Sequence, residues 1–203
     1  MKLKNSDRGL DLNQAIFNPT HMDYAKMAGE LILKSVGENP QREGLLNTPQ
    51  RFSKAIHEVC SGYLLTPADA VGEGIFPGEG AGLISIKDID FFSLCEHHML
   101  PFWGRASVAY YPSDKIIGLS KIPRLVDVFA KRLQVQERLT DQICSGLMTL
   151  IGARAVLVKV SGSHMCMMMR GVKKNGSETI TESSRGLENL TPDEKLRLWK
   201  SID

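Results

Sequence analysis

The 203-residue chain has few cysteines, almost no net charge and no long apolar run. Four scattered cysteines, Cys60, Cys95, Cys144 and Cys166, cannot form a disulfide scaffold, and they favour a cytoplasmic protein with reduced thiols. No segment approaches the length of a membrane span, and the N-terminal residues lack the apolar core of a signal peptide. The net charge of +2 gives no reason to expect nucleic acid or a membrane as a partner.

The spacing of apolar residues divides the chain into three parts. Residues 1–20 are polar and aperiodic, and they predict a flexible arm. Residues 21–70 predict a helical region, in which a second helix begins with Thr48 as its cap and ends by Gly62. Residues 71–203 open with a loop that holds five glycines between positions 72 and 82, and they predict a further domain.

The third part mixes strand and helix periods. Spacing of two with a slip in phase over 84–91 indicates a strand with a bulge, and the turn at Pro112 predicts a hairpin into Ile116 and Ile117. The later predicted elements are two helices, three strands and a final helix, over 121–132, 136–151, 155–160, 164–170, 178–183 and from Thr191. This order predicts an α+β fold with an antiparallel sheet.

Metal-binding side chains are densest in the run Cys-Glu-His-His at 95–98. Cys95 and His98 are three residues apart, so one turn can direct both at the same ion. The Cys-x-x-His spacing also arises by chance, and both residues suit ordinary hydrogen-bonded positions. A closed structural zinc site needs four protein ligands, and no second pair supplies them. If zinc binds here, an open site with a water as fourth ligand is the better interpretation.

A third ligand is available in the segment GSHMCMMMRG at 162–171. If this segment is extended, one face carries His164, Cys166, Met168 and Arg170. The opposite face carries Met165, Met167 and Met169, which we expect to pack in the core. Cys166 can equally be an ordinary buried thiol. His97 and His164 would each lie beside a proposed ligand, where an imidazole suits proton transfer.

A basic cluster begins the helix predicted over 121–132. Ser120 is a plausible cap, and Lys121 and Arg124 can point together at an anion near the helix N-terminus. Arg170 could join them. The alternative is a solvated basic turn, and the spacing alone does not exclude it.

Gln136 and Glu137 begin the next predicted helix. A glutamate there usually compensates the helix dipole. A buried carboxylate could instead accept two parallel donors, such as the N1–H and 2-amino groups of guanine. Adenine cannot present that pair, so such a site would discriminate between the two bases.

Four stretches in this order resemble the zinc-dependent GTP cyclohydrolase I family, namely CEHHMLPF, GLSKIPRLV, RLQVQERLT and SHMCMMMRG. TPQRFSKA at 48–55 is similar to the family's N-terminal helical element. The resemblance runs from about residue 20 to Gly171, and the tail after Val172 departs from the family pattern. It implies the tunnelling fold, an antiparallel β-sheet with a packed helix pair preceded by a helical segment, with residues 71–203 as the catalytic domain.

The resemblance also implies the chemistry. One Zn²⁺ per subunit would be held by Cys95, His98 and Cys166, with a water in the fourth place that attacks C8 of GTP. His164 and His97 would transfer protons. Formate would leave, and the product would be 7,8-dihydroneopterin triphosphate.

The remaining implied residues hold the substrate GTP. Ser120 would engage the ribose during the later ring closure, and Gln136 and Glu137 would hold the guanine. The triphosphate would be bound by Lys121, Arg124 and Arg170, with Arg51 and Lys54 as further candidates. The family assembly is a homodecamer of two pentamers with active sites between subunits, and it involves neither nucleic acid nor a membrane.

Other classes remain as alternatives. Related pterin synthases use an all-histidine zinc site, which Cys95 and Cys166 contradict. Related nitrile reductases use a catalytic thiol without this zinc set, which His98 and Cys166 disfavour. A non-catalytic zinc or nucleotide-binding module is opposed by His97 and His164 beside the ligands. A cytidine-type deaminase would need His-x-Glu and Pro-Cys-x-x-Cys signatures, which the sequence lacks.

Overall fold

The computed structural model describes residues 19–78 and 80–203, which belong to two compact units that meet at Leu64 and Leu65 in the sequence. The predicted flexible arm lies almost wholly in residues 1–18, outside the described part. In the first unit, α2 (Pro19–Ser35) is followed by η1 (Glu43–Leu45), α3 (Thr48–Val59) and η2 (Ser61–Leu64). None of the helices in the described part is both long enough and apolar enough to span a membrane.

The two long helices of the first unit pack closely. A Cβ atom added at Gly29 of α2 would lie 3.2 Å from Cα of Pro49, so the absence of a side chain permits this approach. The hydroxyl of Ser53 donates to the carbonyl of Met22, 2.9 Å away. The prediction that Thr48 caps α3 is wrong: Asn47 is the residue at the N-cap, and Thr48 is already helical, with Pro49 in the first turn.

The second unit contains a five-stranded sheet in the order β5-β2-β3-β6-β7. Its long strands are antiparallel, and the short β5 runs parallel to the end of β2. The strand bounds are β2 (Ile84–Cys95), β3 (Pro101–Tyr111), β5 (Leu133–Gln134), β6 (Ala155–His164) and β7 (Thr179–Arg185). The predicted bulge is confirmed, because the β2–β3 register shifts between Ile86 and Ile89.

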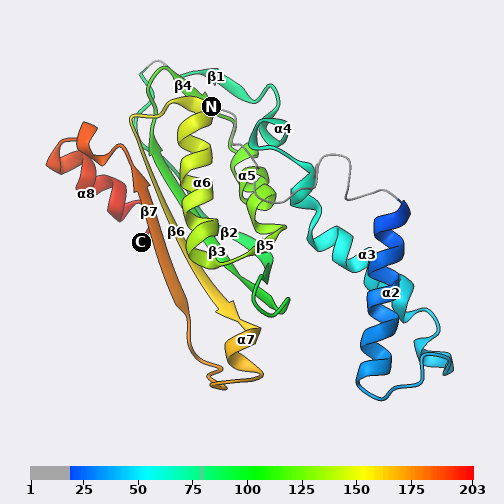
Figure 1. The fold of residues 1–203 in the computed structure, drawn as a ribbon. Coiled ribbons are helices and arrows are strands. Elements are labelled where there is room, and N and C mark those ends of the chain that lie inside the picture. Colours follow the sequence, from blue (N-terminus) through cyan, green and yellow to red (C-terminus); the bar gives the residue numbers. More distant parts are fainter. Residues whose placement is uncertain (1–18, 79) are drawn as a thin grey trace. The chain divides into compact units, whose positions relative to one another are not determined.

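Two helices, α5 (Lys121–Ala130) and α6 (Gln136–Ile151), cover one face of this sheet (Figure 1). Apolar residues of both helices, among them Leu125 and Phe129 of α5, are buried in one core with alternate residues of β3 and β6. Leu139, Ile143, Leu147 and Ile151 recur on one side of α6, and each is at most 2% exposed. Burying a side chain of this kind contributes roughly 1.5–3 kcal/mol, so the apolar stripe fixes α6 on the sheet. The α+β class with a packed helix pair is confirmed.

The predicted hairpin into residues 116 and 117 is wrong. The strand β4 (Lys115–Ile117) pairs antiparallel with β1 (Ile75–Pro77), which lies inside the glycine-rich loop after the short helix α4 (Pro67–Val71). β3 already has β2 on one edge and β6 on the other, so neither edge is free for β4. The backbone N–H of Ile117 instead donates to the buried hydroxyl of Tyr110, 3.3 Å away.

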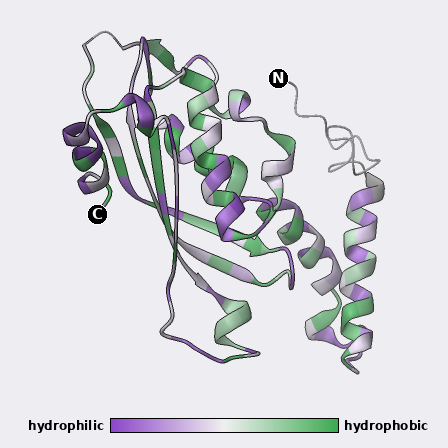
Figure 2. Cartoon of the chain, turned by 60° about the vertical axis from the view of Figure 1, so that its left-hand side comes forward, coloured by the Kyte–Doolittle hydropathy of each residue, from purple (hydrophilic) through white to green (hydrophobic). Residues whose placement is uncertain are grey.

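The C-terminal segment covers the other face of the sheet. Leu190 and Leu198 pack with Ala109 and Leu157, which alternate along their strands with residues of the main core. After η3 (Leu187–Asn189), the predicted final helix is found as α8 (Pro192–Lys200), with Thr191 as its N-cap. Figure 2 shows that hydrophilic residues predominate along this helix, which lies next to the C-terminus.

The start of α8 yields a stability prediction. The Thr191 hydroxyl accepts a bond from the Glu194 N–H (3.2 Å), and the Glu194 carboxylate accepts one from the Thr191 N–H (2.9 Å). Thr191→Ala should therefore lower the free energy of unfolding by about 1 kcal/mol in urea titrations at matched protein concentration. Lys195→Ala, on the same helix, is the control, and an equal loss in both variants would contradict the capping role.

Candidate metal centre

The candidate metal ligands lie where three strands meet at one end of the sheet. β2 ends at Cys95, and β3 begins at Pro101 and pairs on its other side with β6, which ends at His164 opposite Phe102. The turn between β2 and β3 is closed by hydrogen bonds from Cys95 N–H to Leu100 O (2.9 Å) and from Met99 N–H to Cys95 O (2.8 Å). This short turn carries the Cys-Glu-His-His run.

Cys95, His98 and Cys166 form a group whose ligand atoms all lie within 4.8 Å of one another. The Sγ atom of Cys95 is 3.9 Å from Nδ1 of His98. A tetrahedral zinc ion with bonds of about 2.0–2.3 Å separates its ligand atoms by about 3.3–3.8 Å, so adjustments of about 1 Å suffice. Cys95 is buried and His98 is exposed, which leaves one side open to solvent. Two thiols and one imidazole with an open side fit a zinc site that keeps a position for water.

Cys166 reaches this group from a helical turn. The predicted strand over 164–170 is wrong, because β6 ends at His164 and the short helix α7 (Met165–Met168) follows. An extended residue 165 would lie opposite Pro101, which has no N–H to offer a ladder. The predicted core packing of Met165, Met167 and Met169 also fails, since Met169 is 57% exposed and both Met165 and Met167 are only half-buried.

The Cys166 thiol is affected by its surroundings. Burial is the main cause that raises the pKa of the Cys166 thiol, and the neighbouring Cys95 raises this pKa further. A bound dication reverses this preference, because a coordinating thiol is deprotonated. His97 lies at the rim: its Nδ1 is 3.8 Å from Cys95 Sγ, and its side chain is 63% exposed.

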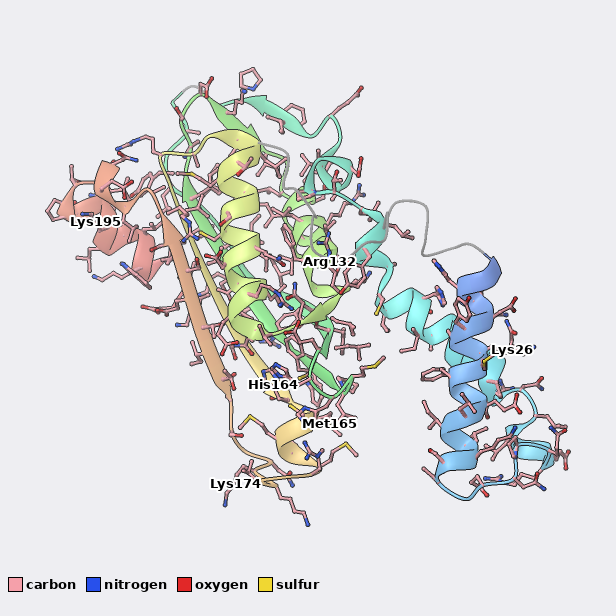
Figure 3. All side chains as sticks on the ribbon, in the orientation of Figure 1. Lys26, Arg132, His164, Met165, Lys174 and Lys195 are labelled. Carbon is pink, nitrogen blue, oxygen red and sulfur yellow. The ribbon has the colours of Figure 1, made fainter. Side chains whose placement is uncertain are left out.

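His164 lies at the end of β6 (Figure 3), where its ring is held on two sides. The imidazole stacks on Phe102 with a centroid separation of 4.6 Å and an interplanar angle of 4°. Its Nε2 atom is 2.8 Å from Oε1 of Gln136. Burial lowers the pKa of His164, and the nearby Glu137 carboxylate partly opposes this effect. The lowered pKa favours a neutral imidazole, which can accept a proton, at neutral pH.

Gln136 and Glu137 begin α6 in different environments. The Gln136 side chain is 2% exposed and bonds to β6 and β7, whereas Glu137 is exposed. Glu137 is therefore accessible to a ligand at the metal end, while the Gln136 amide is engaged inside the fold.

The basic cluster lies at the opposite end of the sheet. Ser120 is the N-cap residue of α5 without a side-chain capping bond, Lys121 opens the helix, and Arg124 is exposed. Lys121 packs its stem over Gly74, where an added Cβ would lie 2.5 Å from the lysine Cε.

This end adjoins Tyr110, whereas the metal group adjoins Phe102. Those two residues of β3 are eight positions apart, or about 25 Å. One chain therefore does not bring Lys121 and Arg124 to the metal group. The exposed Arg170 follows α7 at the metal end, and Arg51 and Lys54 lie exposed on α3 of the first unit.

One ion pair at the metal turn was not predicted. The Arg138 guanidinium of α6 contacts the Glu96 carboxylate and also bonds to Gln134 Oε1 (3.0 Å) and Leu133 O (3.1 Å). It ties the turn that carries Cys95 and His98 to the first turns of α6. The pair joins residues 42 positions apart, so no local pattern could have indicated it.

An antiparallel α+β sheet with a helix pair on one face and a Cys–His–Cys group at its strand ends has the ligand set of a protein that could hold a metal ion. The family model described as GTP cyclohydrolase I matches residues 25–203, and the chain belongs to this family. The fold is accordingly the tunnelling fold that the resemblance implied. The match extends through the C-terminal tail, so the expectation that the resemblance ends at Gly171 is wrong.

Curated relatives agree with the family match. The chain is 48% identical to "GTP cyclohydrolase 1" of Deinococcus radiodurans, over 84% of this chain and 79% of that protein. It is 52% identical to the protein of the same name from Leptospira biflexa, over 80% of this chain and 89% of the relative. The corresponding protein of Campylobacter lari is also 52% identical, over 76% of this chain and 82% of its own length.

Proposed function

We propose that this chain hydrolyses the imidazole ring of GTP, releases formate and yields 7,8-dihydroneopterin triphosphate, the first step of folate and tetrahydropterin biosynthesis. The observation that carries the proposal is the meeting of Cys95, His98 and Cys166 at one end of the sheet. His164 is two residues from the third of them. Relatives at 48–52% identity bear the name of this activity.

The residues at the metal end would bind the metal ion or transfer protons. Cys95, His98 and Cys166 would hold Zn²⁺, which when bound lowers the pKa of a water toward neutrality. His164, kept neutral by burial and fixed against Phe102, would transfer a proton to or from the imidazole ring of the substrate. His97 is exposed at the rim of the metal group and would assist proton transfer near the ribose.

Substrate binding would use both ends of the sheet. Glu137 would accept the N1–H and 2-amino group of guanine at the metal end, and Arg170 would meet the phosphates there. Lys121 and Arg124 lie beside the far end of β3, whose residues Phe102 and Tyr110 are about 25 Å apart, so they would serve a site on another copy of the chain. This separation supports a homo-oligomer, for which we propose the family's decamer of two pentamers. Ser120, at the same helix start, would engage the ribose.

Incubation of the zinc-loaded protein with GTP tests the proposal. The expected result is release of formate and, after oxidation, a fluorescent pterin. A nucleotide that stays unchanged over many protein equivalents would reject the proposed activity. The same protein stripped of metal is the control, and it should be inactive until zinc is restored.

The guanine assignment gives a separate prediction. Glu137→Ala should weaken GTP binding by about 10- to 100-fold, because a charge-assisted acceptor is lost, and should leave the zinc content unchanged. Equilibrium binding of GTP and metal analysis of the same sample provide the measurements. Glu188→Ala, in the exposed η3, is the control, and equal losses of GTP and zinc affinity would contradict the guanine role.

A further inference from the structure

The orientation of the Gln136 amide is determined by its surroundings. Its Nε2 atom lies 3.1 Å from the carbonyl oxygen of Val160 and 2.8 Å from that of Thr179. Carbonyl oxygens only accept hydrogen bonds, so the NH₂ group must occupy this side of the amide. The amide oxygen Oε1 therefore faces Nε2 of His164 at 2.8 Å.

This orientation selects one form of His164. An amide oxygen can only accept, so the hydrogen of the shared bond belongs to Nε2 of the imidazole. A neutral imidazole carries a single N–H, which leaves Nδ1 as the ring atom that can accept a proton. Stacking on Phe102 fixes the plane of the same ring.

The arrangement is supported from three elements. Gln136 belongs to α6, and the carbonyl groups that accept from its amide belong to β6 and β7. The Gln136 side chain crosses β6 at Gly162. A Cβ at Gly162 would lie 2.5 Å from Oε1 of Gln136, so the amide fits only over a glycine. Thr181 of β7 lies 3.2 Å from the amide nitrogen and is itself bonded to Thr140 of α6 (2.6 Å).

We propose that Gln136 is a positioning residue that fixes His164 in the Nε2–H tautomer and leaves Nδ1 as its proton-accepting atom. Both N–H groups of the amide are already bonded within the fold and its oxygen already contacts His164, which opposes the sequence-based expectation that Gln136 holds the guanine. The catalytic consequence rests on the proposed function, whereas the tautomer itself does not.

The tautomer is measured directly by ¹⁵N magic-angle-spinning NMR of the zinc-loaded full chain labelled with ¹⁵N-histidine. The His164 signals are those lost in His164→Asn, and spectra at pH 8 report the neutral ring. Protonated Nε2 is expected in the wild type, and Gln136→Met should give a mixture of tautomers. A wild-type Nδ1–H tautomer, or an unchanged single tautomer in the variant, would overturn the proposal.

Kinetics separate positioning from guanine binding. Gln136→Met should lower kcat by about 10- to 100-fold with KM for GTP within about twofold. Gly162→Ala keeps the amide but displaces its oxygen, and it should show the same pattern. Gln142→Met, another hydrogen-bonded glutamine of α6, is the matched control. A raised KM with unchanged kcat would make Gln136 a substrate ligand. If the wild type leaves GTP intact, the proposed function fails, but the spectra still decide the tautomer.

Discussion

Replacement of Cys166 by alanine is expected to remove the metal and abolish formate release. The remaining pair, Cys95 and His98, comes from one turn and leaves half of a tetrahedral coordination sphere without protein ligands. Even supporting residues around metal ligands cost 10- to 100-fold in affinity, so loss of a ligand should exceed about 100-fold. Zinc titration against a competing chelator measures the affinity, and formate release measures the activity.

Cys60→Ala is the matched control for this experiment. Cys60 is also a partly buried thiol, but it lies in the first unit, outside the metal group. It should retain zinc and activity. If Cys166→Ala kept a full equivalent of zinc at wild-type affinity, the assignment of this thiol as a ligand would be wrong.

Replacement of His164 by alanine, unlike that of Cys166, should leave the zinc content full, although it too should remove most of the turnover. General acid–base groups contribute about 10²–10⁴-fold, so formate release should fall within this range. The loss follows because, among residues 19–78 and 80–203, His164 supplies the imidazole that is stacked on Phe102 beside the metal group. Metal analysis and formate release on the same sample measure both properties.

His21→Ala, on α2 of the first unit, controls for the loss of an imidazole and should behave as the wild type. A metal-free His164→Ala protein would instead make His164 a ligand. Turnover within about threefold of wild type would remove it from the chemistry.

The sequence correctly predicted the helices whose apolar residues recur with one unbroken period. α6 was predicted at residues 136–151, where it is found, because apolar residues recur every turn over its whole length. β4 was assigned to the wrong partner because strand pairing depends on which edges are free, and β3 is occupied on both sides. Cys166 lies on a helical turn because the neighbouring strand begins with a proline, a restriction that only the sheet register reveals.

The predicted site residues form two separate groups for a similar reason. The metal group depends on the Cys-Glu-His-His turn and on Cys166, and the structure brings these ligands together. Ser120, Lys121 and Arg124 are also together, at the start of α5. Their distance from the metal is set by the length of β3, which no local motif encodes.

The distance between Lys121 and the metal group has a consequence for mixed assemblies. If a second copy completes each site, every chain would contribute to two reaction centres. It would supply the metal group to one centre, and Lys121 and Arg124 to another. A substitution in the metal group and a substitution at Lys121 or Arg124 of the same chain would then inactivate different centres. When two inactive variants, one of each kind, are assembled together, some centres would contain no substituted residue and would be active.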